Sequence, residues 1–131
     1  MAITARQIWA KTSFFQVDFE EDQQTNPGRF GRAFAYWLAE QFQARGETVQ
    51  EVLPEDWGWC VMLTRKPYML WVGCANRSGS IDEWGAFVAA EPGFLQRLFS
   101  WHDTRLTVDR IDQILHEIMQ QIPGAGKIWI E

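Results

Sequence analysis

Carboxylates, an amide and large aromatic rings lie close together in the middle of the chain, around residues 55–57 and 76–84. Carboxylates can bind a cation or transfer protons, and their environment tunes both abilities. The candidate binding residues are Glu55, Asp56, Trp57, Trp59, Trp71, Asn76, Arg77, Asp82, Glu83 and Trp84. They predict an acidic-aromatic site suited to a cation, a basic partner or acid/base chemistry. The alternative is that these turns are polar only because they face water.

A predicted β-hairpin over Trp57–Asn76 has to position these residues. Its two apolar runs, 57–64 and 68–76, flank the short polar break Arg65-Lys66-Pro67. Neither run alternates apolar with polar residues, so the hairpin is apolar on both faces and both faces must be covered. What covers the second face is the main functional question.

The favoured register of this hairpin places Trp59 opposite Cys74, because apolar residues then face one another along both strands. In this register Cys60 and Cys74 point to opposite faces, which predicts two free thiols. A slip by one residue would bring the two cysteines together. The next turn, centred on Gly79, predicts a second hairpin in which Asn76 faces Asp82.

Hydrophobic periodicity predicts the remaining elements. The expected helices are Pro27–Ala44, capped at Thr25 or Asn26 and stopped at Gly46, a short helix over 94–99, and a long helix from Thr107 to Pro123-Gly124. The further strands are 12–19, 48–53, 82–90 and an edge strand at 127–131, with 54–56 as a turn and 1–11 as a lead-in or helical turn.

Helices segregated from an antiparallel meander give an α+β fold. We expect one domain over residues 1–131, in which two long helices pack on a sheet of about four to six strands in two layers. In such a meander the start of the first hairpin strand and the end of the second lie at one edge. The polar segments 55–56 and 76–83 should therefore meet there.

Three glycines, Gly58, Gly73 and Gly85, lie inside aromatic-rich strands. Glycine weakens a strand unless something approaches it closely, so large rings beside these positions predict a shallow apolar trough. A helix, a ligand or a tryptophan folded over the gap could fill it. A helix is the first choice, because the chain supplies two.

Other groupings of reactive residues give weaker signals. Acidic residues 18–22 precede the first helix, where carboxylates are favourable without any function, and their spacing matches no Ca²⁺ loop. Gly28, Arg29, Gly31 and Arg32 could hold a phosphate, but they form no phosphate-loop motif, and arginine–carboxylate pairing is the simpler expectation. The cysteines and histidines lack zinc spacing and a nucleophile–base pattern. We therefore predict no metal and no cofactor, and do not favour an enzyme.

Composition limits the class of protein. Of 131 residues 47% are hydrophobic, and eight Trp and nine Phe are enough for a real core and an aromatic recognition surface. A net charge of −5 without a basic run argues against nucleic-acid and membrane binding and leaves room for a basic protein partner. The N-terminus has no signal-peptide core and the longest apolar run, Tyr68–Ala75, is too short for a bilayer, so we expect a cytoplasmic protein.

Three classes of function remain. The favoured one is a non-enzymatic protein-interaction domain that binds a basic partner through the acidic-aromatic surface, with a homodimer as an equal rival. In small size, acidity and α+β build, rather than in any motif, the chain resembles bacterial immunity and antitoxin proteins. The alternatives are a small-molecule binder with a Trp-lined pocket near Trp59 and Trp84, and a carboxylate-based hydrolase.

Overall fold

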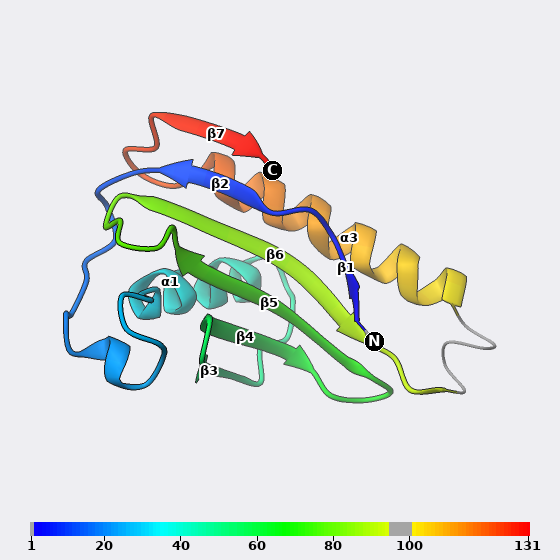
Figure 1. Ribbon diagram of the computed structural model, residues 1–131. Coiled ribbons are helices and arrows are strands. Elements are labelled where there is room, and N and C mark those ends of the chain that lie inside the picture. The colour runs from blue at the N-terminus through cyan, green and yellow to red at the C-terminus, as the bar shows by residue number, and fades with distance from the viewer. Residues whose placement is uncertain (1, 95–100) are drawn as a thin grey trace.

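Residues 2–94 and 101–131 are described by the structure, a computed structural model. They form an antiparallel sheet with both long helices, α1 (Arg32–Ala44) and α3 (Trp101–Gln120), packed on the same face (Figure 1). The predicted two-layer α+β fold is confirmed. The other face of the sheet is turned toward the viewer in Figure 1, and neither α1 nor α3 crosses it.

Within the described residues the sheet has seven strands, all paired antiparallel, in the order β3-β4-β5-β6-β2-β7, with β1 also pairing with β6. Their bounds are β1 Ile3–Thr4, β2 Ile8–Lys11, β3 Glu51–Glu55, β4 Gly58–Thr64, β5 Met69–Asn76, β6 Glu83–Glu91 and β7 Lys127–Ile130. A short 3₁₀ helix, η1 (Glu21–Gln23), lies in the long connection between β2 and α1. The N-terminal strand β2 is therefore inserted between the two elements β6 and β7 from the second half of the chain.

The strand predicted over residues 12–19 is wrong, because the strand in this part of the chain is β2, inside the predicted lead-in. Ile8 and Ala10 of β2 are buried against the helices. The chain then leaves the sheet, and the Thr12 hydroxyl donates a hydrogen bond of 2.9 Å to a carbonyl just after α3. Phe15 enters the core from a loop, so the apolar alternation here reflects loop packing rather than a strand.

Helix α1 begins at Arg32 rather than at the predicted Pro27. The backbone N–H groups of Gly31 and Arg32 donate to the Glu21 carboxylate at 2.7 and 3.0 Å. Glu21, only 3% exposed, therefore accepts hydrogen bonds from the unpaired N–H groups at the helix start in place of a local cap. Its carboxylate occupies the N-terminal end of α1, where the sequence suggested that a phosphate could bind. The predicted stop at Gly46 is confirmed by its left-handed φ of 85° just after the helix.

The predicted register of the central hairpin is confirmed, with Trp59 opposite Cys74. Both cysteines are buried and free, as this register requires. The pairing shifts at a bulge near the hairpin end, where Thr64 rather than Leu63 lies opposite Leu70. The two faces of β4 and β5 are otherwise those expected from the sequence.

The predicted register of the second hairpin is wrong, since Asn76 faces Trp84 rather than Asp82. The Ser80 hydroxyl accepts hydrogen bonds from the backbone N–H groups of Asp82 and Glu83 at 3.2 and 3.1 Å, which keeps Asp82 in the turn. The loop is therefore longer than predicted, and the pairing of β5 with β6 is shifted by two residues. Because side chains alternate along a strand, the residues of β6 keep their predicted faces.

Helix α3 is already formed at Trp101, so Thr107 is not its cap, and the Thr107 hydroxyl instead donates to the Asp103 carbonyl one turn back at 3.1 Å. Its predicted buried stripe is confirmed at Ile111, Leu115, Ile118, Met119 and Ile122. The short helix predicted over 94–99 falls mostly on residues 95–100, outside the described residues. In the described part of the chain, no helix has the length and apolar character needed to cross a membrane.

The two outer strands were partly anticipated. β7 is an edge strand, as predicted for the C-terminal segment. β3 starts at Glu51, within the predicted strand 48–53, and continues through Pro54 and Glu55, which were predicted to form a turn. Proline is tolerated there because β3 is an edge strand and one of its sides needs no ladder hydrogen bonds.

Candidate functional site

The sheet face without helices carries five large rings, which come from four strands and the β3–β4 turn: Trp9, Trp57, Trp71, Phe87 and Trp129. We call it the open face. A helix was the first choice for covering the strand glycines, and this expectation is wrong, because α1 and α3 both pack on the opposite face (Figure 1). Rings of the open face itself cover Gly73 and Gly85, whereas Gly58 lies against the Cys74 carbonyl and Ala75.

Gly73 and Gly85 provide the space in which these rings lie. A Cβ atom at position 73 would stand 2.6 Å from a Phe87 ring carbon and 2.8 Å from Trp57, and one at position 85 would stand 2.7 Å from Trp9. Contacts this short do not occur, so a side chain at either position would displace a ring. Of the alternatives predicted for the trough, a tryptophan folded over the gap is the one observed.

Three of the rings form a cluster, Trp57, Trp71 and Phe87, with centroids 5.6 to 5.8 Å apart. We call it the ring cluster. Farther along the sheet Trp9 and Trp129 lie opposite each other on β2 and β7 and stack at 6.3 Å. Such offset and edge contacts are the favoured geometries of aromatic pairs. They fix two aromatic walls with a gap between them.

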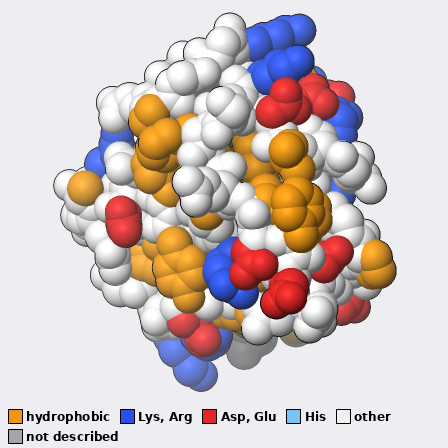
Figure 2. Space-filling model, turned by 90° about the vertical axis from the view of Figure 1, so that its left-hand side faces the viewer, with side chains coloured by type: hydrophobic (Ala, Val, Ile, Leu, Met, Phe, Trp, Pro, Cys, Tyr) orange, Lys and Arg blue, Asp and Glu red, His pale blue; other side chains and the backbone are white. Residues whose placement is uncertain are grey.

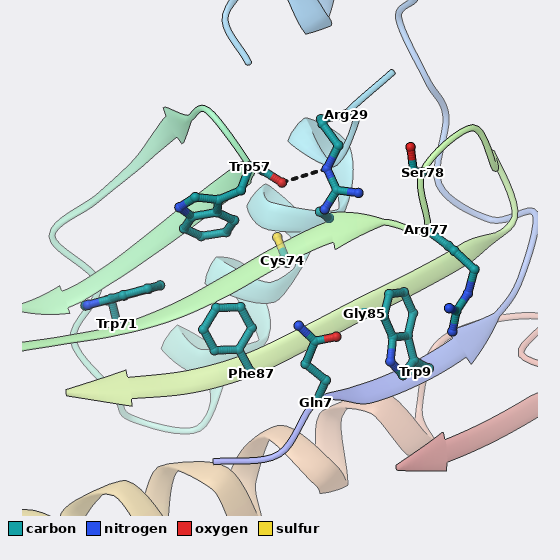
Figure 3. Close-up of a pocket in the computed structure, with 11 residues that line it drawn as sticks. Gln7, Trp9, Arg29, Trp57, Trp71, Cys74, Arg77, Ser78, Gly85 and Phe87 are labelled. Atoms are coloured by element: carbon teal, nitrogen blue, oxygen red, sulfur yellow. Dashed lines mark hydrogen bonds between the residues drawn. The ribbon is translucent and has the colours of Figure 1, made fainter. Parts of the chain in front are cut away.

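The gap is a hollow of about 500 Å³, which we call the basic hollow. Figure 3 shows Trp57 and Phe87 on one side of it, Trp9 and Arg77 on the other, and Arg29 at its upper end. Its floor is formed by small residues of β5 and β6, including Ala75 and Gly85. Its volume is in the range of small-molecule sites.

The two arginines of this hollow differ in their partners. Arg77 lies 3.7 Å from Glu83 and 3.1 Å from Glu131, and its guanidinium stacks 4.3 Å above the Trp9 ring centroid. Arg29 donates from Nε to the Trp57 carbonyl at 2.9 Å and has no carboxylate partner within the described residues. Burial lowers the pKa of the Arg29 guanidinium, as expected for a cation that has lost water without gaining an anion.

A smaller hollow of about 220 Å³ lies on the other side of the ring cluster, and we call it the acidic hollow. Its lining residues are Glu55, Trp57, Cys60, Met62, Met69, Trp71 and Glu91. Neither the Glu55 nor the Glu91 side chain makes a hydrogen bond or ion pair within the described part of the chain. Burial, then the Glu55 charge, raises the pKa of the Cys60 thiol to about 12, with Glu91 adding to the effect and Arg65 opposing it. The open face therefore presents negative and positive ends separated by aromatic rings.

The predicted site residues divide between the two faces of the sheet. Trp57, Trp71, Glu55 and Arg77 lie at the two hollows. Trp59 and Trp84, 3% and 1% exposed, belong to the packed core under the helices. The hollows that Trp57 and Trp71 line lie on the opposite face from that core and include neither Trp59 nor Trp84, so the pocket expected near Trp59 and Trp84 is misplaced.

The remaining predicted residues hold the turns at one edge of the sheet. Asn76 is fully buried; its side-chain oxygen accepts from the Phe30 N–H, and its amide group donates to the Gly28 and Ser80 carbonyls. Asp82 accepts from the Ser80 hydroxyl. The other two are Glu83, near Arg77, and Asp56, exposed in the β3–β4 turn. These residues share an edge as expected, but form no single acidic site.

Sequence reasoning missed Trp9, Arg29, Phe87 and Glu91 as site residues. Phe87 and Glu91 could have been found from strand alternation, since both share the face of Gly85 on the predicted strand 82–90. Trp9 was missed because β2 was not recognised. Arg29 was considered only for a phosphate at the helix start, because nothing in the sequence shows that a loop brings it to the hollow.

A third hollow, of about 520 Å³, lies at the end of the molecule shown in Figure 2, where hydrophobic side chains appear in separate patches among polar and charged ones. Its lining includes Phe15, Val17, Phe19, Ile81 and the single carboxylate Asp82. It has no unpaired cation and no stacked ring pair, so it offers a ligand less directed contact than the open face.

Within residues 2–94 and 101–131, no three His, Cys, Asp or Glu side chains gather closely enough to hold a metal ion. Burial raises the pKa of the Cys74 thiol well above its ordinary value, as it does for Cys60, so neither cysteine favours a thiolate. Comparisons of the chain with protein-family models, with curated proteins and with solved structures found no match.

Proposed function

We propose that this chain is a non-enzymatic binding protein that holds a basic segment of a protein partner on its open face. The observation that carries the proposal is the pair of unpaired carboxylates, Glu55 and Glu91, beside the ring cluster on a face that neither α1 nor α3 covers. A lysine or arginine side chain in the acidic hollow would lie against Trp57 and Trp71, in the field of the two carboxylates that line the hollow. Charge-assisted bonds and cation–π contacts act together in such a site.

The chemistry of the open face supports binding rather than catalysis. The one nucleophilic side chain in the acidic hollow is Cys60, which is buried and held as a thiol. Both histidines, His102 and His116, are on α3 behind the opposite face of the sheet. A nucleophile beside a base is the arrangement that covalent catalysis needs, and the open face offers none among the described residues.

The net charge of −5 supports a basic partner, because opposite net charges speed encounter and disfavour wrong partners. A basic toxin held by an immunity-type protein would be a partner of this kind. Aromatic residues enriched in the centre of a surface with charges around them are also the usual composition of a protein interface.

The test is binding of a lysine-rich peptide, labelled for fluorescence polarisation, with the same peptide acetylated on every lysine as its control. Glu55→Gln combined with Glu91→Gln should weaken binding of the lysine peptide about tenfold, from loss of two charge contacts and a weaker cation–π site. Two substitutions outside the open face, Glu117→Gln with Glu40→Gln, remove the same charge from exposed helix positions and should change little. Equal effects of both pairs would reduce the interaction to net charge and contradict the proposal.

A second copy of the chain is the rival occupant of the open face. Sedimentation of the unliganded protein separates the two cases, with a monomer expected. If the protein is a dimer and Met62→Glu dissociates it, the open face would instead be assigned to self-association. Met62 lies in the acidic hollow, and burying a third carboxylate there against an apolar partner surface would cost desolvation energy.

A further inference from the structure

We propose that the basic hollow is a separate ligand site on the same face, and that its ligand is a small planar aromatic molecule with one carboxylate. The site shares Trp57 and Trp71 with the proposed protein-binding surface but has its own charged residue, Arg29, and its own wall, Trp9. It therefore does not depend on the basic partner.

The shape of the hollow selects a flat ligand. Its walls are aromatic on both sides, and the small side chain of Ala75 leaves space between them, while Gly85 lies beneath the Trp9 ring (Figure 3). The walls are held from behind, since Trp9 stacks on Trp129 and Trp57 packs in the ring cluster. A rigid slot between indole rings buries a planar ring at little cost in conformational entropy.

Arg29 gives the hollow its preference for an anion. Its Nε is already bound to the Trp57 carbonyl, which orients the guanidinium, and its two terminal nitrogens have no partner in the described chain. A carboxylate can accept from both terminal nitrogens at once, in the bidentate geometry that arginine favours. Such a ligand would supply the anion that this partly buried cation lacks.

The charges around the basic hollow favour a ligand with a single negative charge. Arg77, the second cation of the hollow, is already balanced by Glu83 and Glu131. A phosphate dianion would meet these carboxylates with only one uncompensated cation to hold it. Gln7 and Ser78 at the rim, with no side-chain hydrogen bonds among the described residues, can bond a neutral polar group of the ligand.

Indole-3-acetate is the test probe, with indole-3-acetamide as its uncharged equivalent, titrated into the ¹⁵N-labelled protein. We expect saturable shifts of the Trp9 indole N–H and the Gln7 side-chain amide, and affinity about tenfold or more greater for the carboxylate than for the amide. Equal affinity for the two probes, or no saturable shift at millimolar indole-3-acetate, would overturn the proposal.

Arg29→Met should remove this preference for the carboxylate while the weak binding of the amide remains. Arg105→Met is the matched control, because Arg105 is exposed on α3 in the other layer and pairs with Asp109. If Arg29→Met perturbs the fold, the comparison of the two probes on the unaltered protein still decides the question.

Tryptamine, which carries an amine in place of the carboxylate, separates this inference from the proposed function. It should shift the methyl signals of Met62 and Met69 in the acidic hollow. Tryptamine binding without indole-3-acetate binding would overturn the present inference and leave the proposed function standing. The reverse result would support the anion site and count against a cation in the acidic hollow.

Discussion

Individual residues decide what the open face can bind, because each large ring there has a specific neighbour. Gly73 and Gly85 admit the rings of Trp57, Phe87 and Trp9, so these two glycines act as parts of the site although they contribute no side chain. The unpaired charges then lie on either side of the ring cluster. A face of rings without these charges would bind apolar surfaces indiscriminately.

The reactivity of the cysteines tests the placement of the rings. Both thiols should react slowly with a disulfide reagent at neutral pH, because each is buried and each pKa is raised. Trp71→Ala should speed the reaction of Cys60, which shares the acidic hollow with Trp71, and leave Cys74, in the core, slow. Timed labelling followed by mass spectrometry assigns each cysteine, and Cys60→Ser should abolish the faster reaction. Equal acceleration of both thiols would indicate general loosening instead.

At the scale of elements, α3 carries a carboxylate that does not fit its surroundings well. Asp112 has one buried oxygen without a hydrogen-bond partner and lies 3.5 Å from His116. Burial raises the pKa of Asp112 above 3.8, an effect that the charges of His116 and Arg105 oppose and that of Asp109 reinforces. The native state therefore binds this proton more tightly than the unfolded chain.

The sign of the pH effect follows from this difference. As pH rises from 3.8 through the raised pKa, the native state gives up a proton that the unfolded state has already lost, so this group lowers stability. Asp112→Asn should thus gain stability relative to the unaltered protein as pH rises toward neutrality. Urea unfolding at a series of pH values checks this, with Glu117→Gln at an exposed position of the same helix as the control for loss of charge. A constant difference across the series would show that Asp112 titrates alike in both states.

The elements that sequence could predict are those whose pattern is set by burial alone. The central hairpin, the stripe of α3 and the end of α1 at Gly46 follow from apolar spacing and a glycine stop. The start of α1 could not be predicted, because its cap is Glu21 from another segment. β2 was not predicted because its four residues, Ile8–Lys11, are too few to show a strand periodicity in the sequence. It forms a strand because it pairs with β6 and β7, which are distant in the sequence.

The same limit applies to the site. Trp57, Trp71, Glu55 and Arg77 were found from the sequence because the hairpin brings them to one face. Choosing between Trp59 and Trp57 required knowing which face the helices cover, and a hairpin that is apolar on both sides gives no such signal. The acidic turns were found, but Asn76 and Asp82 are committed to hydrogen bonds within the turns, and Glu83 lies near Arg77.

At the scale of the whole molecule, one face of the sheet is a core and the other is a surface. Trp84→Ala should lower the free energy of unfolding by about 3–5 kcal/mol, since it empties a fully buried site between Phe15 and Phe34. Trp71→Ala should cost less than half as much, because Trp71 is only partly buried on the open face. Chemical denaturation of both variants provides the measurement. Similar losses would mean that the open face is packed as tightly as the core.

The position of β2 also determines the order in which parts of the sheet can form. Ile8 pairs with Ala86 on one side and with Ile130 on the other, so β2 has to wait for two segments that are synthesised much later. Local pairs such as β4 with β5 can close first, whereas ladders between distant segments form slowly. Until β2 is seated, β6 keeps a bare edge and the stacked wall of Trp9 and Trp129 does not exist. A nascent chain therefore acquires its ring cluster well before it acquires the basic hollow.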